Sequence, residues 1–329
     1  MSRTQKARTR PGAVLQELAR DRLGVPAVLF FVLAGVAPLT VAAWVIPAAY
    51  ATTGLTGIPA AFGAIAVILA LFATGYVAMT RHITNAGAFY AFISRGLGRP
   101  AGVAAALVAL LAYSFLQVGL YGAFGPNAAS QAAAHLGVHA AWWVWALGAW
   151  AVVTVLGLAR VDITGRVLGV LLCAEIAVTL AETISGLASP AGGHLSAAAL
   201  SPGALTTGGF GTVGILVLLA ATAAAVVAFF ARDPRGESIW PRLIAPAVAA
   251  VLLTGLVVLA LLHYSTLLGV AAGATAAWAL PASYAAVTAA GLAWGLVLKA
   301  RRPQTYAAIG LGAHAVTGQS APAARGTRR

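Results

Sequence analysis

Residues 85–100 read NAGAFYAFISRGLGRP, a short basic stretch between two long apolar runs at 59–80 and 101–125. Each run is long enough for a membrane-spanning helix, which needs about 20 mostly apolar residues. The stretch between them carries Arg95 and Arg99. Because arginine is kept out of the hydrocarbon core, we expect two spanning helices joined by a positively charged connection on one side of the membrane.

The composition of the whole chain favours the same class of protein. Of its 329 residues, 61% are hydrophobic and 8% are charged, and the mean hydropathy is +0.92. A soluble domain carries about 25% charged residues, and a disordered chain has far less apolar surface. The single cysteine, Cys173, excludes a disulfide framework and a cysteine-based zinc site. We therefore expect an all-α polytopic membrane protein without a metal or other cofactor.

Eight apolar runs are expected to span the membrane, within a helical domain over residues 27–298. They cover residues 27–50, 59–80, 101–125, 141–159, 167–188, 211–231, 243–265 and 276–298. Residues 1–26 form a basic N-terminal segment whose following apolar run is too long for a signal peptide. Residues 299–329 form a mostly disordered tail, rich in Ala, Gly, Ser and Pro towards its end.

The positive charges predict the topology. All 20 Lys and Arg residues fall on one side of an eight-helix arrangement, in the segments 3–22, 81–99, 160–166, 232–242 and 299–329. The positive-inside rule then places both termini in the cytoplasm and the chain in the cytoplasmic membrane. The formal net charge of +13 is explained by this topology, with some attraction to anionic membrane lipid. It does not indicate a nucleic-acid partner.

The first expected span is interrupted near its middle by Gly35-Val36-Ala37-Pro38-Leu39-Thr40. Proline removes a backbone donor and disfavours helix in the preceding turn. Irregular backbone at this depth is tolerated only inside protein or along a cavity. In transporters, such breaks expose backbone groups that bind charged parts of a substrate. The alternative is a simple proline kink with no ligand.

Two sequence features resemble the amino acid–polyamine–organocation (APC) superfamily of permeases. In that family a small-residue and tyrosine stretch precedes a Gly-Leu-Gly element between helices 2 and 3, and the matching residues here are Gly87, Tyr90, Gly96 and Gly98. The run that ends in Pro38-Leu39-Thr40 resembles the family's substrate-binding helix. Residues 25–187 resemble its first five helices.

The resemblance implies a secondary transporter with two inverted five-helix repeats. Its substrates would be amino acids or related amines, bound at breaks in helices 1 and 6. The residues that would contact the substrate are Gly35, Val36, Ala37, Pro38 and Thr40.

The second half of the chain departs from the family pattern. Residues 208–222 resemble the start of helix 6, but Ala223–Ala231 then lead directly into Arg232 and a charged loop that resembles a late cytoplasmic loop. The family's four middle helices are therefore expected to be missing, and helix 6 to be one continuous span. The site beside helix 1 would then lie open to lipid or be closed by a second copy of the chain. Family variability in this region is the alternative to a fusion.

Glu175 and Glu182 are the only acidic residues within an expected span. They lie seven residues apart and thus on one helical face. Carboxyl groups at membrane depth are costly, and burial favours their protonated form, so we expect a role in proton coupling. The alternative is two structural, hydrogen-bonded acids.

The expected function is thus amino-acid permease. Its rivals are a non-transporting membrane protein, as a permease remnant or a subunit of a larger assembly, and a membrane enzyme. No constellation of catalytic residues supports the enzyme.

Overall fold

The computed structural model describes residues 25–47, 50, 57–83, 88–158, 161–188, 213–265, 270–271 and 273–310. These residues form helices and connections, and within them there is no strand. The predicted N-terminal segment up to residue 24 and the tail beyond residue 310 lie outside this range.

Six of the described helical segments are long and apolar enough to cross a membrane, which makes the chain a helical membrane protein. They are Ile58–Thr80, Arg99–Leu136, Leu168–Gly186, Ile215–Arg232, Trp240–Leu262 and Thr275–Arg301. A seventh apolar helix, α7 (Trp142–Leu158), is shorter. The first expected span is divided into α1 (Val25–Val36), α2 (Pro38–Thr40) and a π-helical segment η1 (Val41–Val45). All eight predicted runs therefore coincide with helix, while the number that crosses the membrane stays a prediction.

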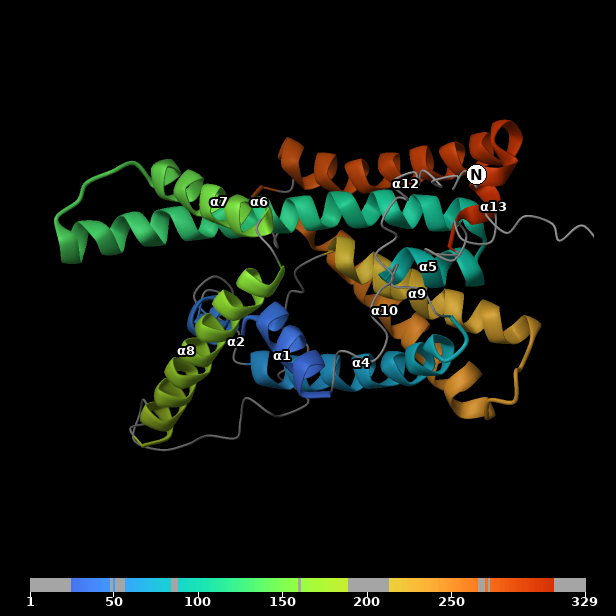
Figure 1. Ribbon diagram of the computed structural model, residues 1–329, viewed down its shortest axis with the longest axis horizontal. Coiled ribbons are helices and arrows are strands. Elements are labelled where there is room, and N and C mark those ends of the chain that lie inside the picture. Colours follow the sequence, from blue (N-terminus) through green and yellow to red (C-terminus); the bar gives the residue numbers. More distant parts are fainter. Residues whose placement is uncertain are drawn as a thin grey trace, which may run out of the picture.

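A compact bundle contains α4 (Ile58–Thr80), α5 (Ala88–Gly96), α9 (Val213–Arg232), α10 (Ala245–Leu262) and α12 (Thr275–Arg301), with the first half of α6 (Arg99–Leu136) (Figure 1). Small residues let these helices approach closely, as is common in membranes. Gly291 and Gly295, one turn apart on α12, face Ala104 and Pro100 on α6. A Cβ atom on Gly295 would lie 2.6 Å from the Cα of Pro100, so this contact requires glycine.

The helix ends that carry positive charge meet at one end of this bundle. There, α4 and α9 end, α6 begins and α12 ends (Figure 1). Arg81 follows α4, Arg99 opens α6 and Arg301 closes α12. Glu237, in the connection after α9, lies 3.3 Å from Arg81 and joins that connection to the end of α4. This arrangement agrees with the one-sided charge pattern of the sequence.

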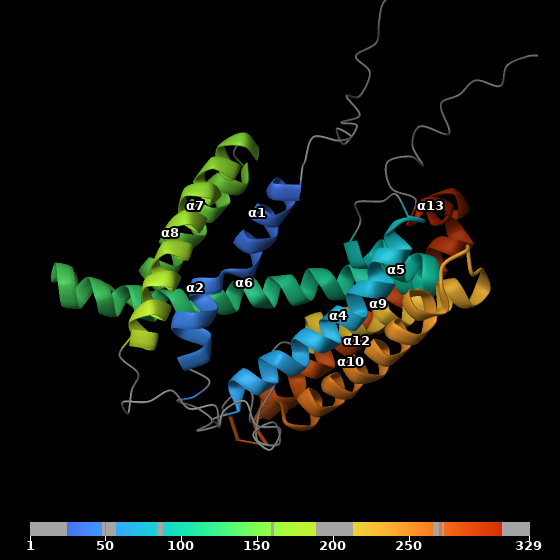
Figure 2. The ribbon, with the colours of Figure 1, turned by 90° about the horizontal axis from the view of Figure 1, so that it is seen from below.

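A second group of helices lies to one side of the bundle. It comprises α7, α8 (Val161–Ala188), α1 and α2, of which α1, α2 and α7 contact α8. In Figure 1 α7 lies along the distal half of α6, whereas α8, α1 and α2 lie below α6 (Figures 1 and 2). The 38 residues of α6 correspond to about 57 Å of helix, more than the thickness of a bilayer. This long helix joins the two groups.

The helix that contains the third expected span extends beyond residue 125. The helix continues through Pro126 to Leu136, where Gly137 ends it in a left-handed conformation. Proline is tolerated inside membrane helices because other groups can satisfy the freed backbone atoms. Pro126 frees the carbonyl of Gly122, and the neighbouring Asn127 side-chain amide donates to the carbonyl of Ala123 at 2.9 Å.

The predicted tail also begins with ordered structure. Helix α12 extends to Arg301, and a short helix α13 (Pro303–Ala308) follows. The guanidinium of Arg99 lies 5.2 Å from the ring centre of Tyr306 and links α13 to the start of α6. The prediction of disorder therefore concerns only the residues after 310.

The glycines of the 85–100 stretch have identifiable structural roles. Helix α5 packs between α6 and α9, and Gly96 is buried where an added Cβ would overlap the backbone of Ala225. Gly98 has φ 106° and ψ 160°, a conformation that is essentially reserved for glycine. Tyr90 is half-buried and packs on the cluster around Ile93 and Val108. Gly87 lies outside the described residues.

Candidate functional site

The first span is broken where the sequence predicted it. Helix α1 ends at Val36, and Ala37 adopts the left-handed conformation with φ 48° and ψ 64°. A new helical segment begins at Pro38, which suits a first helical position because its missing N–H would have no partner there. The π-helical segment η1 follows directly, so helical structure runs on to residue 47. Left-handed non-glycine residues and π-helical turns are both enriched at functional sites.

A carboxylate from another helix binds the broken end. The backbone N–H of Leu39 donates to Oε1 of Glu175 on α8 at 2.8 Å. The two residues are 136 positions apart in the sequence. The structure thus brings together two features that the sequence analysis identified separately, namely the break in helix 1 and one of the two intramembrane acids.

The contact acts as a helix cap supplied from another helix. The first N–H groups of a helix have no partner within it, and the residue before Pro38 is Ala37, whose side chain has no hydrogen-bonding atom. Glu175 fills this role, and a negative charge is favoured at the positive N-terminal end of the helix dipole. A hydrogen bond to an ionised carboxylate is about twice as strong as a neutral one. The strength of this cap therefore depends on whether Glu175 carries a proton.

The elements that position the two groups pack on each other. Both α1 and α2 lie against α8. A Cβ atom at Gly169 of α8 would meet the ring of Phe30 at 3.6 Å, an ordinary contact distance. Glu175 is half-buried, and its carbonyl accepts a hydrogen bond from Thr179 at 2.8 Å.

The opposite side of the break is open. Val36 is 56% exposed, and Gly35 and Thr40 are also exposed, whereas Ala37 and Pro38 are half-buried. Helix α9, which contains most of the sixth expected span, packs mainly on α10 and α5. It is one helix from Val213 to Arg232, which confirms the prediction of an unbroken segment there. The broken helix thus has a carboxylate on one side and no second broken helix facing it among the described residues.

The other predicted site residues do not join this arrangement. Glu182 lies two turns beyond Glu175 on the same helix and is exposed. Tyr90, Gly96 and Gly98 belong to the bundle, where they shape the packing between α5, α6 and α9. Among the described residues, no group of three or more His, Cys, Asp or Glu side chains could hold a metal ion.

Comparison with known proteins gives no match: no family model, curated protein or solved structure corresponds to the chain. The resemblance to the APC superfamily therefore stays a prediction from the motifs.

Proposed function

We propose that the chain is a secondary transporter of amino acids or related amines in the cytoplasmic membrane, with Glu175 as its proton-coupling group. The observation that supports it most directly is the hydrogen bond from Leu39 at the broken first helix to the carboxylate of Glu175. The carboxylate of an amino-acid substrate would bind to a backbone N–H at the positive end of a helix. In the structure, the carboxylate of Glu175 accepts a hydrogen bond from such an N–H, that of Leu39.

Protonation supplies the coupling in this proposal. An ionised Glu175 holds the Leu39 N–H through a charge-assisted bond, and a protonated Glu175 holds it less strongly. The N–H is then free for the carboxylate of an incoming amino acid. Substrate and proton therefore occupy the site together.

The cavity wall that α9 does not provide would come from a second copy of the chain, because the break in helix 1 is exposed on that side.

A second candidate is a non-transporting membrane protein, either a permease remnant or a subunit of a larger assembly. The continuous α9 and the exposed side of the break favour this candidate. In that case Glu175 serves only as a structural cap.

Uptake of radiolabelled amino acids into proteoliposomes distinguishes the two functions. The purified full-length protein, reconstituted with an inward proton gradient, should accumulate label above protein-free vesicles, and Glu175→Gln should abolish gradient-driven uptake. Glu182→Gln is the matched control, because Glu182 is an exposed acid on the same helix, and we expect it to keep most of the uptake. Absence of uptake by the wild-type protein for every amino acid and amine tested would support the second candidate.

A further inference from the structure

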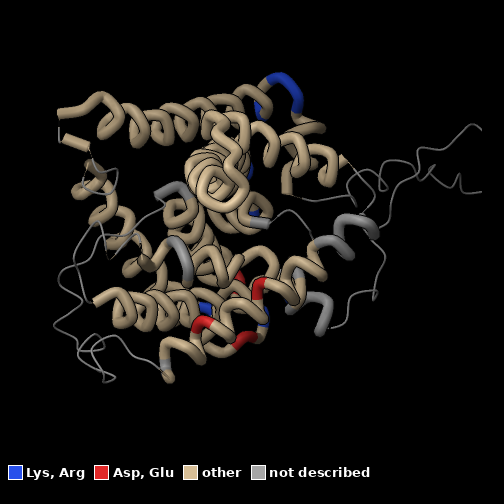
Figure 3. The backbone as a smooth tube through the Cα atoms, turned by 90° about the vertical axis from the view of Figure 1, so that its left-hand side faces the viewer, with Lys and Arg blue, Asp and Glu red and all other residues tan. Residues whose placement is uncertain are grey.

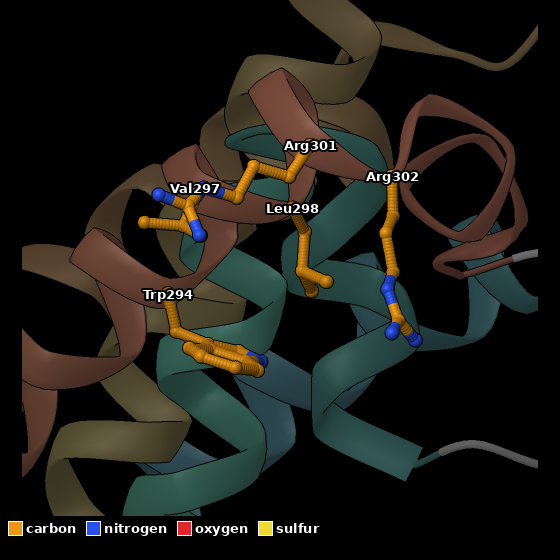
Figure 4. Close-up of a pocket in the computed structure, with 5 residues that line it drawn as sticks. All are labelled: Trp294, Val297, Leu298, Arg301 and Arg302. Atoms are coloured by element: carbon orange, nitrogen blue, oxygen red, sulfur yellow. The ribbon is translucent and has the colours of Figure 1, made fainter.

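A hollow with a basic rim lies at the charged end of α12, away from the broken helix. It has a volume of about 330 Å³ and is lined by Trp294, Val297, Leu298, Arg301 and Arg302. In Figure 4 the guanidinium groups of Arg301 and Arg302 lie on either side of Leu298, and Trp294 lies further along the helix. Four of these residues stand at positions i, i+3, i+4 and i+7 of α12 and therefore share one face of the helix, namely Trp294, Val297, Leu298 and Arg301.

A second hollow lies beside the first, on the side of α6. Its volume is about 440 Å³, and the two hollows share Trp294 as a lining residue. Its other walls are mostly apolar and include Val103 and Leu107 from α6 and Ile309 beyond α13. Trp294 therefore borders both a mostly apolar hollow and a hollow whose rim carries two arginines.

The positive charge at the mouth is not neutralised within the described residues. Neither Arg301 nor Arg302 lies within ion-pair distance of a described carboxylate, and both side chains are exposed. In Figure 3 the Lys and Arg segment at the end of α12 lies apart from the Asp and Glu segments. Arg99, at the nearby start of α6, adds a further positive charge beside α13.

We propose that this pair of hollows binds one anionic phospholipid of the inner leaflet, with its phosphate at Arg301 and Arg302 and an acyl chain along Trp294. The dimensions fit the bilayer. Seven residues of helix separate Trp294 from Arg301, which corresponds to about 10 Å along the axis. If Arg301 lies at the headgroups, Trp294 reaches the upper acyl chains, because the headgroup layer is about 5–8 Å thick on each side. Guanidinium groups are well suited to phosphate, since they donate several parallel hydrogen bonds.

Native mass spectrometry of the full-length protein, released from nanodiscs of phosphatidylglycerol and phosphatidylcholine, tests this site. The wild type should retain one phosphatidylglycerol in preference to phosphatidylcholine. The double variant Arg301→Gln/Arg302→Gln should bind phosphatidylglycerol at least about tenfold more weakly, because it removes the charge-assisted hydrogen bonds to the lipid phosphate. The matched control Lys299→Gln/Arg232→Gln removes the same charge from exposed residues outside the hollow and should leave retention unchanged.

Two further arms keep the test decisive. Arg301→Lys/Arg302→Lys retains the charge and should retain most of the lipid, which separates charge loss from misfolding. Trp294→Ala should weaken retention of phosphatidylglycerol. Millimolar inorganic phosphate should displace the lipid no more readily from this variant than from the wild type. The proposal is overturned if both lipids are retained equally, if the two double glutamine variants behave alike, or if millimolar inorganic phosphate alone displaces the lipid.

Discussion

Replacement of Glu175 by leucine isolates the energy of the cap at the broken helix. The Leu39 N–H donates to this carboxylate at 2.8 Å, and Ala37 offers no side-chain substitute. A hydrogen bond to a charged group contributes about 1.5–3 kcal/mol. Because a tenfold change in an equilibrium corresponds to about 1.4 kcal/mol, local opening at Leu39 should become about 10- to 150-fold more frequent.

Hydrogen–deuterium exchange of the reconstituted protein, resolved to the amides of residues 39–45, measures this opening directly. Glu175→Leu should accelerate exchange by the stated factor. Glu175→Gln keeps a neutral acceptor and should show roughly half of the free-energy effect. Glu182→Leu should leave these amides unchanged, because Glu182 lies exposed two turns away. Equal acceleration by the two leucine variants, or none with Glu175→Leu, would refute the cap.

Further predictions concern packing and topology. Gly98→Ala should destabilise the protein by about 1–3 kcal/mol in detergent unfolding, because φ at this residue is 106°; an unchanged midpoint would contradict this. Gly295→Val should cost about 1–3 kcal/mol by overpacking against α6, whereas Gly119→Val, where the space around an added Cβ is open, should be nearly neutral in the same assay. With the single cysteine replaced by serine, a cysteine at Ala191 should label from outside and one at Ala323 from inside. Labelling of both from one side would exclude the eight-span topology.

The break in helix 1 could be predicted from local sequence. Gly35 and Pro38 lie close together at the middle of an apolar run, and proline cannot donate the hydrogen bond that a helix requires. The continuous α9 could be predicted for the converse reason, since its Ala, Val and Phe residues neither end a helix nor free backbone groups.

The residue that binds the broken end of helix 1 could not be predicted in the same way. Glu175 was identified because an acid within a span is rare and costly, but its contact with Leu39 connects residues 136 positions apart. No local pattern encodes such a pairing, which depends on how α2 packs on α8. The length of α6 was also missed, because Gly125 and Pro126 are typical of a helix end in water, whereas the structure continues to Leu136.

The basic hollow beside α12 was equally hidden from the sequence. In the sequence, Arg301 and Arg302 are part of the charge pattern that indicates topology. The relation of Arg301 to Trp294 is visible along one helix face, but the second hollow also needs Val103 from α6 and Ile309 from the segment after α13. Only the packing of α6 beside α12, through Gly291 and Gly295, brings these residues together.

Proton movement driven by substrate tests the central claim most directly. Proteoliposomes loaded with a pH-sensitive dye, holding the full-length protein at equal internal and external pH, would receive each amino acid in turn. We predict acidification of the lumen by the wild type and by Glu182→Gln for at least one amino acid or amine, and no acidification by Glu175→Gln. Acidification that persists in Glu175→Gln would contradict the role of this carboxylate, and no acidification by the wild type with any substrate would contradict proton-coupled transport.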